Sequence, residues 1–172
     1  IVTINHRLNA FGYLYLGDLG GGEFRDAASV GMLDCVLALQ WVKDNIADFG
    51  GDPARVLIYG ESGGARKTSS MMALPPAQGL FHRRVVQSGS QLRLDTPDIG
   101  MERTEKLLKA LGIPKNDLAR LWMATQDEIL AAVPGLLPGD FNADSAVDAA
   151  DLAQWQGDFG ANSMSDADYD GD

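Results

Sequence analysis

Apolar residues in the first half of the chain alternate between short β-branched runs and one longer segment with helical spacing. Residues 1–4, 55–59 and 85–87 are short runs rich in Val, Ile, Leu and Tyr, and each is typical of a buried strand. In residues 26–46 the apolar positions recur every three or four residues, as expected for a helix. Strands that alternate with helices predict an α/β fold with a parallel sheet covered on both faces.

The remaining pattern predicts four more helices and a glycine-rich loop. The helices are expected over residues 65–73, 101–111, 117–123 and 126–133. The segment 17–22 contains four glycines and is expected to be a loop. The long helix of residues 26–46 is expected to be capped by Asp26 or Ser29, since both side chains can accept a backbone hydrogen bond.

Composition changes sharply near residue 134, and this change predicts a domain boundary. Residues 1–138 contain all 14 Lys and Arg and 15 of the 24 Asp and Glu, whereas residues 139–172 contain 9 Asp and no basic residue. We therefore expect a globular segment over 1–133, a linker over 134–138 and an acidic segment over 139–172. The net charge of −10 argues against nucleic acid as a partner.

Two further features limit the possible classes of protein. Cys35 is the only cysteine, which excludes an intrachain disulfide framework, and its apolar helical neighbours favour an inert core thiol over a reactive one. No apolar run is long enough to cross a membrane. Because Ile1 is not Met and already belongs to a strand-like run, we expect the native chain to begin upstream of it.

The segment Gly60-Glu61-Ser62-Gly63-Gly64 matches the pattern G-x-S-x-G, between a predicted strand and a predicted helix. In this context the serine occupies a sharp turn, and side chains at Gly60 or Gly64 are expected to collide with nearby backbone. The hydroxyl of Ser62 would project above the sheet as a nucleophile, while the amide of Gly63 would point toward a developing oxyanion. The pattern alone is weak, because glycine and serine are common, so a structural role for Ser62 stays open.

Several further stretches occur in the order and spacing of a known family. They are residues 3–9 (TINHRLN), 31–34 (GMLD), 38–42 (ALQWV), 45–53, 60–64, 79–83 (GLFHR) and 87–90 (QSGS). Residues 1–133 thus resemble the type B carboxylesterase/lipase family. The resemblance implies a partial α/β-hydrolase fold and a serine hydrolase that acts on small-molecule carboxylic esters through an acyl-enzyme, with Ser62 as nucleophile. His6 replaces the family's usual tyrosine, and Gly63 its frequent alanine, which keeps the backbone amide.

The resemblance also indicates what this chain does not supply. In this fold the catalytic acid and then the histidine follow the serine along the chain. His6 precedes Ser62, and His82 lies in a stretch where the family uses it for packing. Glu61 is expected to be a buried, hydrogen-bonded residue of the turn, and Asp34 a packing or capping residue. The family's catalytic histidine, acid and upstream oxyanion loop lie outside this chain, so we expect the isolated chain to hydrolyse esters very slowly or not at all.

The acidic segment has the spacing of a calcium-binding loop. Its predicted metal ligands occupy positions 1, 3, 5, 7, 9 and 12 of a twelve-residue loop, and they are Asp140, Asn142, Asp144, the carbonyl of Ala146, Asp148 and Asp151. Such oxygen donors suit Ca²⁺. A partial second copy begins at Asp166 and ends with the chain. The alternative is a solvated acidic linker.

Residues 139–172 resemble a dockerin repeat, an EF-hand-like loop followed by a helix. The resemblance implies a structural calcium ion, a cohesin-like partner and a secreted or cell-surface location. Two hypotheses therefore remain for the chain. The first is a carboxylic ester hydrolase, and the second is a non-catalytic, esterase-derived fragment whose tail binds calcium and an extracellular partner.

Overall fold

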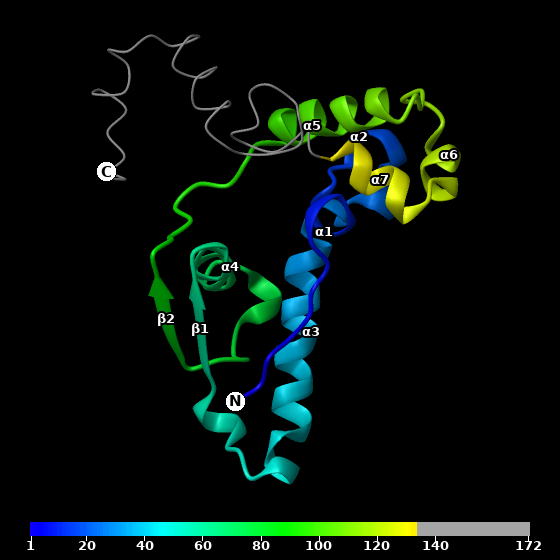
Figure 1. The fold of residues 1–172 in the computed structure, drawn as a ribbon. Helices are drawn as coiled ribbons and strands as arrows, with labels where there is room; N and C mark the ends of the chain where they lie inside the picture. The colour runs from blue at the N-terminus through cyan, green and yellow to red at the C-terminus, as the bar shows by residue number, and fades with distance from the viewer. Residues whose placement is uncertain (134–172) are drawn as a thin grey trace, which may run out of the picture. The chain divides into compact units, whose positions relative to one another are not determined.

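The computed structural model describes residues 1–133, and the predicted linker and acidic segment lie outside them. The chain divides into two compact units at residues 101 and 102. The helices and strands of the first unit, coloured blue to green in Figure 1, are α1 (Asn9–Tyr13), α2 (Gly17–Gly20), α3 (Val30–Asn45), β1 (Leu57–Glu61), α4 (Gly63–Met71), β2 (Arg83–Gln87) and the start of α5 (Pro97–Ala110). The described part of the second unit holds the rest of α5, α6 (Leu118–Met123) and α7 (Gln126–Ala132).

Single 3-10 turns connect several of these elements. They are η1 (Gly21–Phe24), η2 (Ala27–Ser29), η3 (Ile46–Phe49), η4 (Pro53–Arg55) and η5 (Pro75–Ala77). The turn η4 illustrates their local origin, because the Asp52 carboxylate accepts a hydrogen bond of 2.9 Å from the backbone N–H of Ala54, beside a proline in the first turn.

The sheet of the first unit consists of two parallel strands. In its register Leu57 lies opposite Arg83 and Glu61 lies opposite Gln87. Helix α4 connects the two strands and packs against both of them (Figure 1). The alternation of strand and helix confirms the α/β class expected from the sequence.

A small apolar core joins α3, α4 and β1. Cys35 of α3 and Met71 of α4 are buried in it, and Ile58 of β1 packs against them. Burial of these side chains provides the main stabilisation of a unit this small, at roughly 25 cal/mol per Å² of apolar surface. The core therefore fixes the position of α4, and with it the turn that precedes α4.

The predicted strand over residues 1–4 is not formed, which is a correction to the sequence analysis. Residues 1–8 have no regular secondary structure, and Ile1, Val2 and Ile4 are exposed. The backbone N–H of Arg7 is bonded to the Asp34 carboxylate at 2.9 Å rather than to a strand. A β-branched run favours a strand only where a partner completes its ladder. Within the described residues β1 therefore has β2 as its only strand partner.

The glycine-rich segment 17–22 is also not an open loop, because it forms α2 and the first half of η1. The carbonyl of Leu16, a buried residue, accepts hydrogen bonds from the amides of Leu19 and Gly20, at 3.0 and 2.8 Å. A Cβ at Gly20 would lie 2.1 Å from the ring of Phe24, so a side chain there would have to displace that ring. Glycine weakens a helical turn by only about 1 kcal/mol relative to alanine, and local hydrogen bonds offset this.

The other predicted helices form within a few residues of their expected bounds. Helix α3 begins after Ser29, whose side chain makes no capping hydrogen bond, and Asp26 precedes the 3-10 turn rather than the helix. The predicted side-chain cap is therefore wrong, while the helix itself is confirmed. In the second unit a capping box of Thr125 and Glu128 begins α7. Among residues 1–133, no helix is both long and apolar enough to span a bilayer.

Candidate active site

Ser62 occupies the turn between β1 and α4, as the G-x-S-x-G pattern predicts. Its backbone angles are φ 49° and ψ −116°, a region that non-glycine residues rarely adopt. Such a conformation costs about 1–3 kcal/mol and persists only where its surroundings enforce it. The residue is exposed, and its hydroxyl makes no capping hydrogen bond to α4. The strained turn therefore sets the direction of the Ser62 side chain, and this side chain does not cap α4.

Two hydrogen bonds fix the backbone of this turn. The amide of Ser62 donates to the carbonyl of Gln87 at 2.9 Å, which extends the β1–β2 pairing by one residue. The carbonyl of Ser62 accepts from the amide of Arg66 at 3.0 Å, the first bond of α4. Strand and helix therefore each hold one side of the Ser62 peptide.

The glycines around Ser62 have different roles. A Cβ on Gly60 would lie 2.2 Å from the carbonyl carbon of Gly64, so the close approach of strand and helix requires glycine there. A Cβ on Gly64 would meet no atom within 4 Å. The expected collision at Gly64 is therefore wrong, because an added Cβ there would enter open space. At Gly63 the nearest atom to an added Cβ would be the Lys67 Nζ, 3.8 Å away, which leaves room for alanine.

Gly63 is the first residue of the nine-residue helix α4. Amides in the first turn of a helix have no acceptor within the helix, and the helix dipole adds positive potential there. A backbone donor beside the Ser62 hydroxyl suits a negatively charged oxygen that develops on an attacked carbonyl carbon.

Neither histidine is hydrogen-bonded to Ser62 in the described residues. His82 lies before β2 and binds the backbone of Val56, accepting from its amide at Nδ1 (3.2 Å) and donating its own amide to the carbonyl (2.9 Å). Val56 lies six residues before Ser62 at the opposite end of the strands, about 20 Å away at 3.3 Å per residue. The His6 Nδ1–H donates to the carbonyl of Arg7 at 3.0 Å. His82 therefore has the structural role expected of it.

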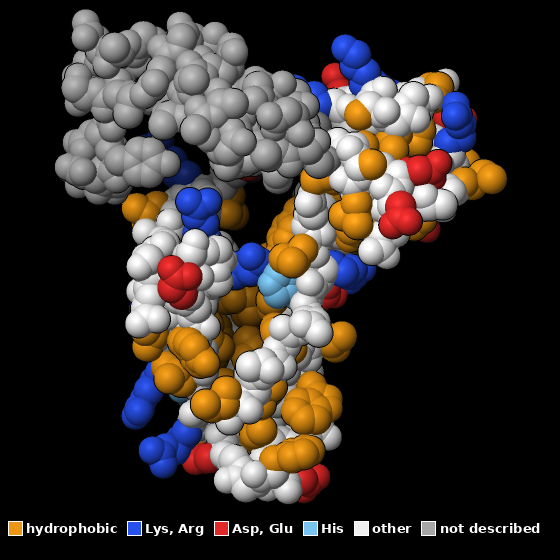
Figure 2. Space-filling model, in the orientation of Figure 1, with side chains coloured by type: hydrophobic (Ala, Val, Ile, Leu, Met, Phe, Trp, Pro, Cys, Tyr) orange, Lys and Arg blue, Asp and Glu red, His pale blue; other side chains and the backbone are white. Residues whose placement is uncertain are grey.

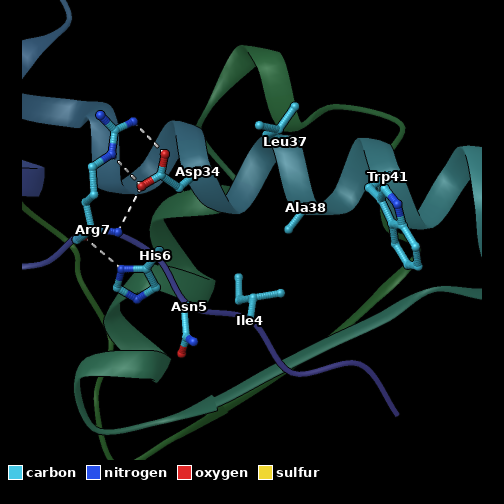
Figure 3. Close-up of a pocket in the computed structure, with 8 residues that line it drawn as sticks. All are labelled: Ile4, Asn5, His6, Arg7, Asp34, Leu37, Ala38 and Trp41. Carbon is cyan, nitrogen blue, oxygen red and sulfur yellow. Dashed lines mark hydrogen bonds and ion pairs between the residues drawn. The ribbon is translucent and has the colours of Figure 1, made fainter.

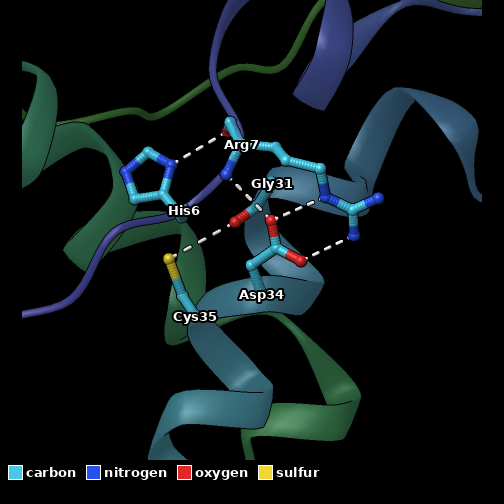
Figure 4. A network of polar contacts seen from close by, with 5 residues as sticks. All are labelled: His6, Arg7, Gly31, Asp34 and Cys35. Atoms are coloured by element: carbon cyan, nitrogen blue, oxygen red, sulfur yellow. Dashed lines mark hydrogen bonds and ion pairs between the residues drawn. The ribbon is translucent and has the colours of Figure 1, made fainter.

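Of the two acidic residues considered in the sequence analysis, Glu61 differs from expectation, whereas Asp34 has a structural role. Glu61 ends β1 and is exposed, rather than buried and hydrogen-bonded, because no third strand covers it in the described residues. Asp34 caps no helix. Its carboxylate accepts hydrogen bonds from Nη2 (2.6 Å), Nε (2.9 Å) and the backbone amide of Arg7 (Figure 4). The side-chain hydrogen bond from Arg7 lowers the pKa of Asp34 to about 2. Asp34 therefore anchors the N-terminal segment to α3.

Cys35 lies beside this network without taking part in the ion pair. Its thiol donates to the carbonyl of Gly31 at 3.4 Å and is 9% exposed (Figure 4). Burial raises the pKa of Cys35, which disfavours the reactive thiolate. These observations agree with the core role that the sequence indicates for this residue.

Two hollows flank the N-terminal segment. A shallow one of about 680 Å³ lies between segment 4–7 and α3, with the Arg7–Asp34 ion pair at one end and Trp41 at the other (Figure 3). A groove of about 590 Å³ separates residues 1–6 from the free edge of β1, and Gly64 and Lys67 contribute to its wall. Figure 2 shows hydrophobic side chains at the surface of the first unit, around a hollow. Both hollows are largely apolar.

The structure leaves the predicted calcium ligands untested. In residues 1–133 no cluster of three or more His, Cys, Asp and Glu could hold a metal ion. The residues predicted to bind calcium lie outside this described range, and they are Asp140, Asn142, Asp144, Ala146, Asp148 and Asp151.

The chain is similar to known proteins both in sequence and in fold. The profile of the carboxylesterase family matches residues 1–135. The para-nitrobenzyl esterase of Bacillus subtilis (strain 168) is 36% identical over 79% of this chain, and the match covers 27% of that esterase. The medium-chain fatty acyl-CoA hydrolase precursor of Anas platyrhynchos is 37% identical over 70% of this chain and is covered over 21% of its length.

Solved structures extend the comparison to the fold. A carboxylesterase from Geobacillus stearothermophilus superposes with a TM-score of 0.74 and 46% identity, over 78% of this chain and 28% of that one. Such neighbours are α/β-hydrolase carboxylesterases, so residues 1–133 carry a part of that fold. The chain therefore spans between 21% and 28% of the length of these proteins.

Proposed function

Because the chain belongs to the carboxylesterase family, we propose that it is part of a carboxylic ester hydrolase in which Ser62 is the nucleophile. The observation that carries the proposal is the conformation of Ser62, an exposed serine with positive φ at the point where β1 enters α4. A strained serine at a strand-to-helix turn is the arrangement that presents a nucleophile above a sheet.

The proposed reaction has two steps. The Ser62 Oγ attacks the carbonyl carbon of the ester, and the resulting oxyanion accepts a hydrogen bond from the Gly63 amide. Collapse of this intermediate expels the alcohol and leaves an acyl-enzyme, which water then hydrolyses. In each step a base removes a proton from the attacking oxygen and then returns it to the departing oxygen, which is the alcohol in the first step and Ser62 in the second.

The base and its supporting acid are not among the described residues. His82 lies at the far end of the strands, and Asp34 is held by Arg7. We propose that the histidine and the acid come from parts of an esterase that residues 1–133 do not include. The substrate is a small-molecule carboxylic ester. The relatives named for nitrobenzyl esters and for fatty acyl-CoA indicate that the acyl and leaving groups vary within the family.

Covalent labelling tests the assignment of Ser62. The chain is treated with an alkyl fluorophosphonate, and the modified residue is identified by peptide mass spectrometry. We expect the label on Ser62, slowly, and its loss in Ser62→Ala but not in Ser70→Ala. Labelling spread equally over other exposed serines, such as Ser88 and Ser90, would argue that Ser62 is not activated. Turnover of a short-chain nitrophenyl ester should be very slow or absent, because the base is not supplied.

A second proposal concerns the acidic segment, and its support is the spacing of oxygen donors in the sequence. We propose that residues 140–151 bind one structural Ca²⁺ and that the segment docks to a cohesin-like protein outside the cell. If Ser62 is inert, this binding would be the function of a non-catalytic esterase-derived chain. Calcium titration of the full chain by calorimetry should give a dissociation constant of roughly 10⁻⁴–10⁻³ M. The double variant Asp140→Ala, Asp144→Ala should not bind, and equal heats from both proteins would refute the loop.

A further inference from the structure

The peptide that follows β2 packs directly against the backbone of Ser62. A Cβ placed on Gly89 would lie 2.6 Å from the carbonyl oxygen of Ser62 and 3.3 Å from its Cα. These are backbone atoms, so they cannot swing aside as the end of a flexible side chain could. Gly89 has no positive φ, and its conformation alone would permit alanine. Contact with the Ser62 peptide is therefore what requires glycine at this position.

The same peptide is tied to α4 on its other side. The amide of Gln91 donates to the hydroxyl of Ser69 at 2.8 Å, and that hydroxyl donates to the carbonyl of Arg66 at 2.8 Å. Ser69 is 8% exposed, so water does not readily replace its hydroxyl as the acceptor for the Gln91 amide. The hydroxyl of Ser70 also donates to the Arg66 carbonyl, at 2.9 Å, but among the described residues no hydrogen bond joins it to Gln91.

Residues 87–91 therefore make three contacts with the Ser62 turn and with α4. The carbonyl of Gln87 accepts from the Ser62 amide, Gly89 lies against the Ser62 carbonyl, and Gln91 is bonded to the second turn of α4. Ser88 within this segment has φ 54°, so the chain turns sharply between the first two contacts. Two strained serines, one after each strand, thus lie at the same end of the sheet.

We propose that Gly89 and Ser69 are positioning residues for Ser62, acting through the 87–91 segment. The proposal rests on the assignment of Ser62 as nucleophile, which it deepens. A side chain at position 89 would displace the Ser62 carbonyl and so disturb the first hydrogen bond of α4, which that carbonyl makes with Arg66. Loss of the Ser69 hydroxyl would release Gln91 and allow the segment to move away from the turn.

The test compares four variants of the full chain by NMR-detected amide exchange and ¹³C chemical shifts. Gly89→Ala is paired with Gly22→Ala, whose added Cβ would meet nothing within 4 Å, and Ser69→Ala is paired with Ser70→Ala. We expect exchange of the Ser62 amide to accelerate at least about fivefold in Gly89→Ala and Ser69→Ala, the effect of one lost hydrogen bond of typical strength. The Val42 amide in α3 should be unchanged, which separates local loosening from general destabilisation.

Ser69→Thr restores a hydroxyl at position 69 and should return the Ser62 amide to its original exchange rate. Unchanged exchange and shifts at Ser62 in Ser69→Ala would overturn the proposal, even if Gly89→Ala fails to fold. The rate of fluorophosphonate labelling at Ser62 should fall in the same two variants and in neither control. If Ser62 is not labelled in any protein, the nucleophile assignment fails, whereas the exchange data still decide whether residues 87–91 hold the turn.

Discussion

Arg7 and Asp34, 27 residues apart, are joined by three nitrogen–oxygen contacts of 2.6–2.9 Å. Two of the contacts come from the guanidinium and one from the backbone amide of Arg7, so both the side chain and the main chain of this segment are fixed against α3. Bidentate pairs of this kind are stronger and more directional than a single ionic contact. The pair holds the N-terminal segment against α3 shortly before the chain enters α1.

Acid should weaken this link over a defined pH range. Arg7 lowers the pKa of Asp34 to about 2, below the roughly 3.9 of an unfolded chain. Folding therefore favours the ionised carboxylate, and the stability it contributes is complete above about pH 4 and is lost as the pH falls toward 2. We expect Asp34→Asn to lower the urea midpoint at pH 7, with the difference from wild type shrinking between pH 4 and 2.

Asp44→Asn is a suitable control, because the Asp44 carboxylate contacts the neutral amide of Gln40 and no cation in the described residues. Its urea midpoint should differ little from that of the wild type at any pH in this range. A pH-independent difference between Asp34→Asn and wild type would show that the Arg7 contact does not stabilise the ionised form.

A buried hydroxyl offers a stabilising substitution. The Oη of Tyr13 is buried without a hydrogen-bond partner in the described residues, and burial raises the pKa of Tyr13 to about 12. A buried polar group without a partner costs about 1–3 kcal/mol. Tyr13→Phe should therefore raise the free energy of unfolding by about 1 kcal/mol. In Tyr15→Phe, where the lost hydroxyl donates to Asp18 at 3.0 Å, no such gain is expected. Equal effects in urea melts of the two variants would contradict this.

The elements that could be predicted from sequence are those determined by nearby residues. Strand β1, the turn at Ser62 and helix α4 follow one another along the chain, so their glycines and apolar residues indicate the structure directly. The strand expected over residues 1–4 is not formed, because a strand needs a neighbouring strand and β-branched residues do not specify which one. The Arg7–Asp34 pair was missed for the same reason: opposite charges far apart in sequence are common, and only the fold brings these two together.

The sequence also did not distinguish Gly60 from Gly64, although only Gly60 lies close to other backbone. Replacing each glycine with alanine tests this difference. Gly60→Ala should destabilise the chain by about 2–3 kcal/mol or more, because its Cβ would overlap the backbone of Gly64. Gly64→Ala should be neutral or stabilising by up to about 1 kcal/mol, because α4 has space there and alanine favours a helix. Thermal melts of the two variants measure the difference. Equal destabilisation would mean that Gly64 is as tightly enclosed as Gly60.

The strain at Ser62 should itself be measurable as stability. Glycine adopts positive φ without the penalty of about 1–3 kcal/mol that a serine bears, and this gain exceeds the roughly 0.5–1 kcal/mol that glycine loses in chain entropy. The Ser62 hydroxyl makes no capping bond to α4, so its removal sacrifices no contact of that kind. We therefore expect Ser62→Gly to raise the free energy of unfolding by about 0.5–2 kcal/mol while abolishing fluorophosphonate labelling.

The matched control is Ser70→Gly, which makes the same chemical change within α4. It should lower the free energy of unfolding by about 0.5 kcal/mol, because glycine is a poorer helix former than serine. The Ser70 hydroxyl bonds the Arg66 carbonyl, so its removal adds to the loss. Urea denaturation of the two variants would thus move the midpoint in opposite directions. A decrease at both sites would mean that the backbone of Ser62 is relaxed and that its turn is not one that forces a nucleophile above the sheet.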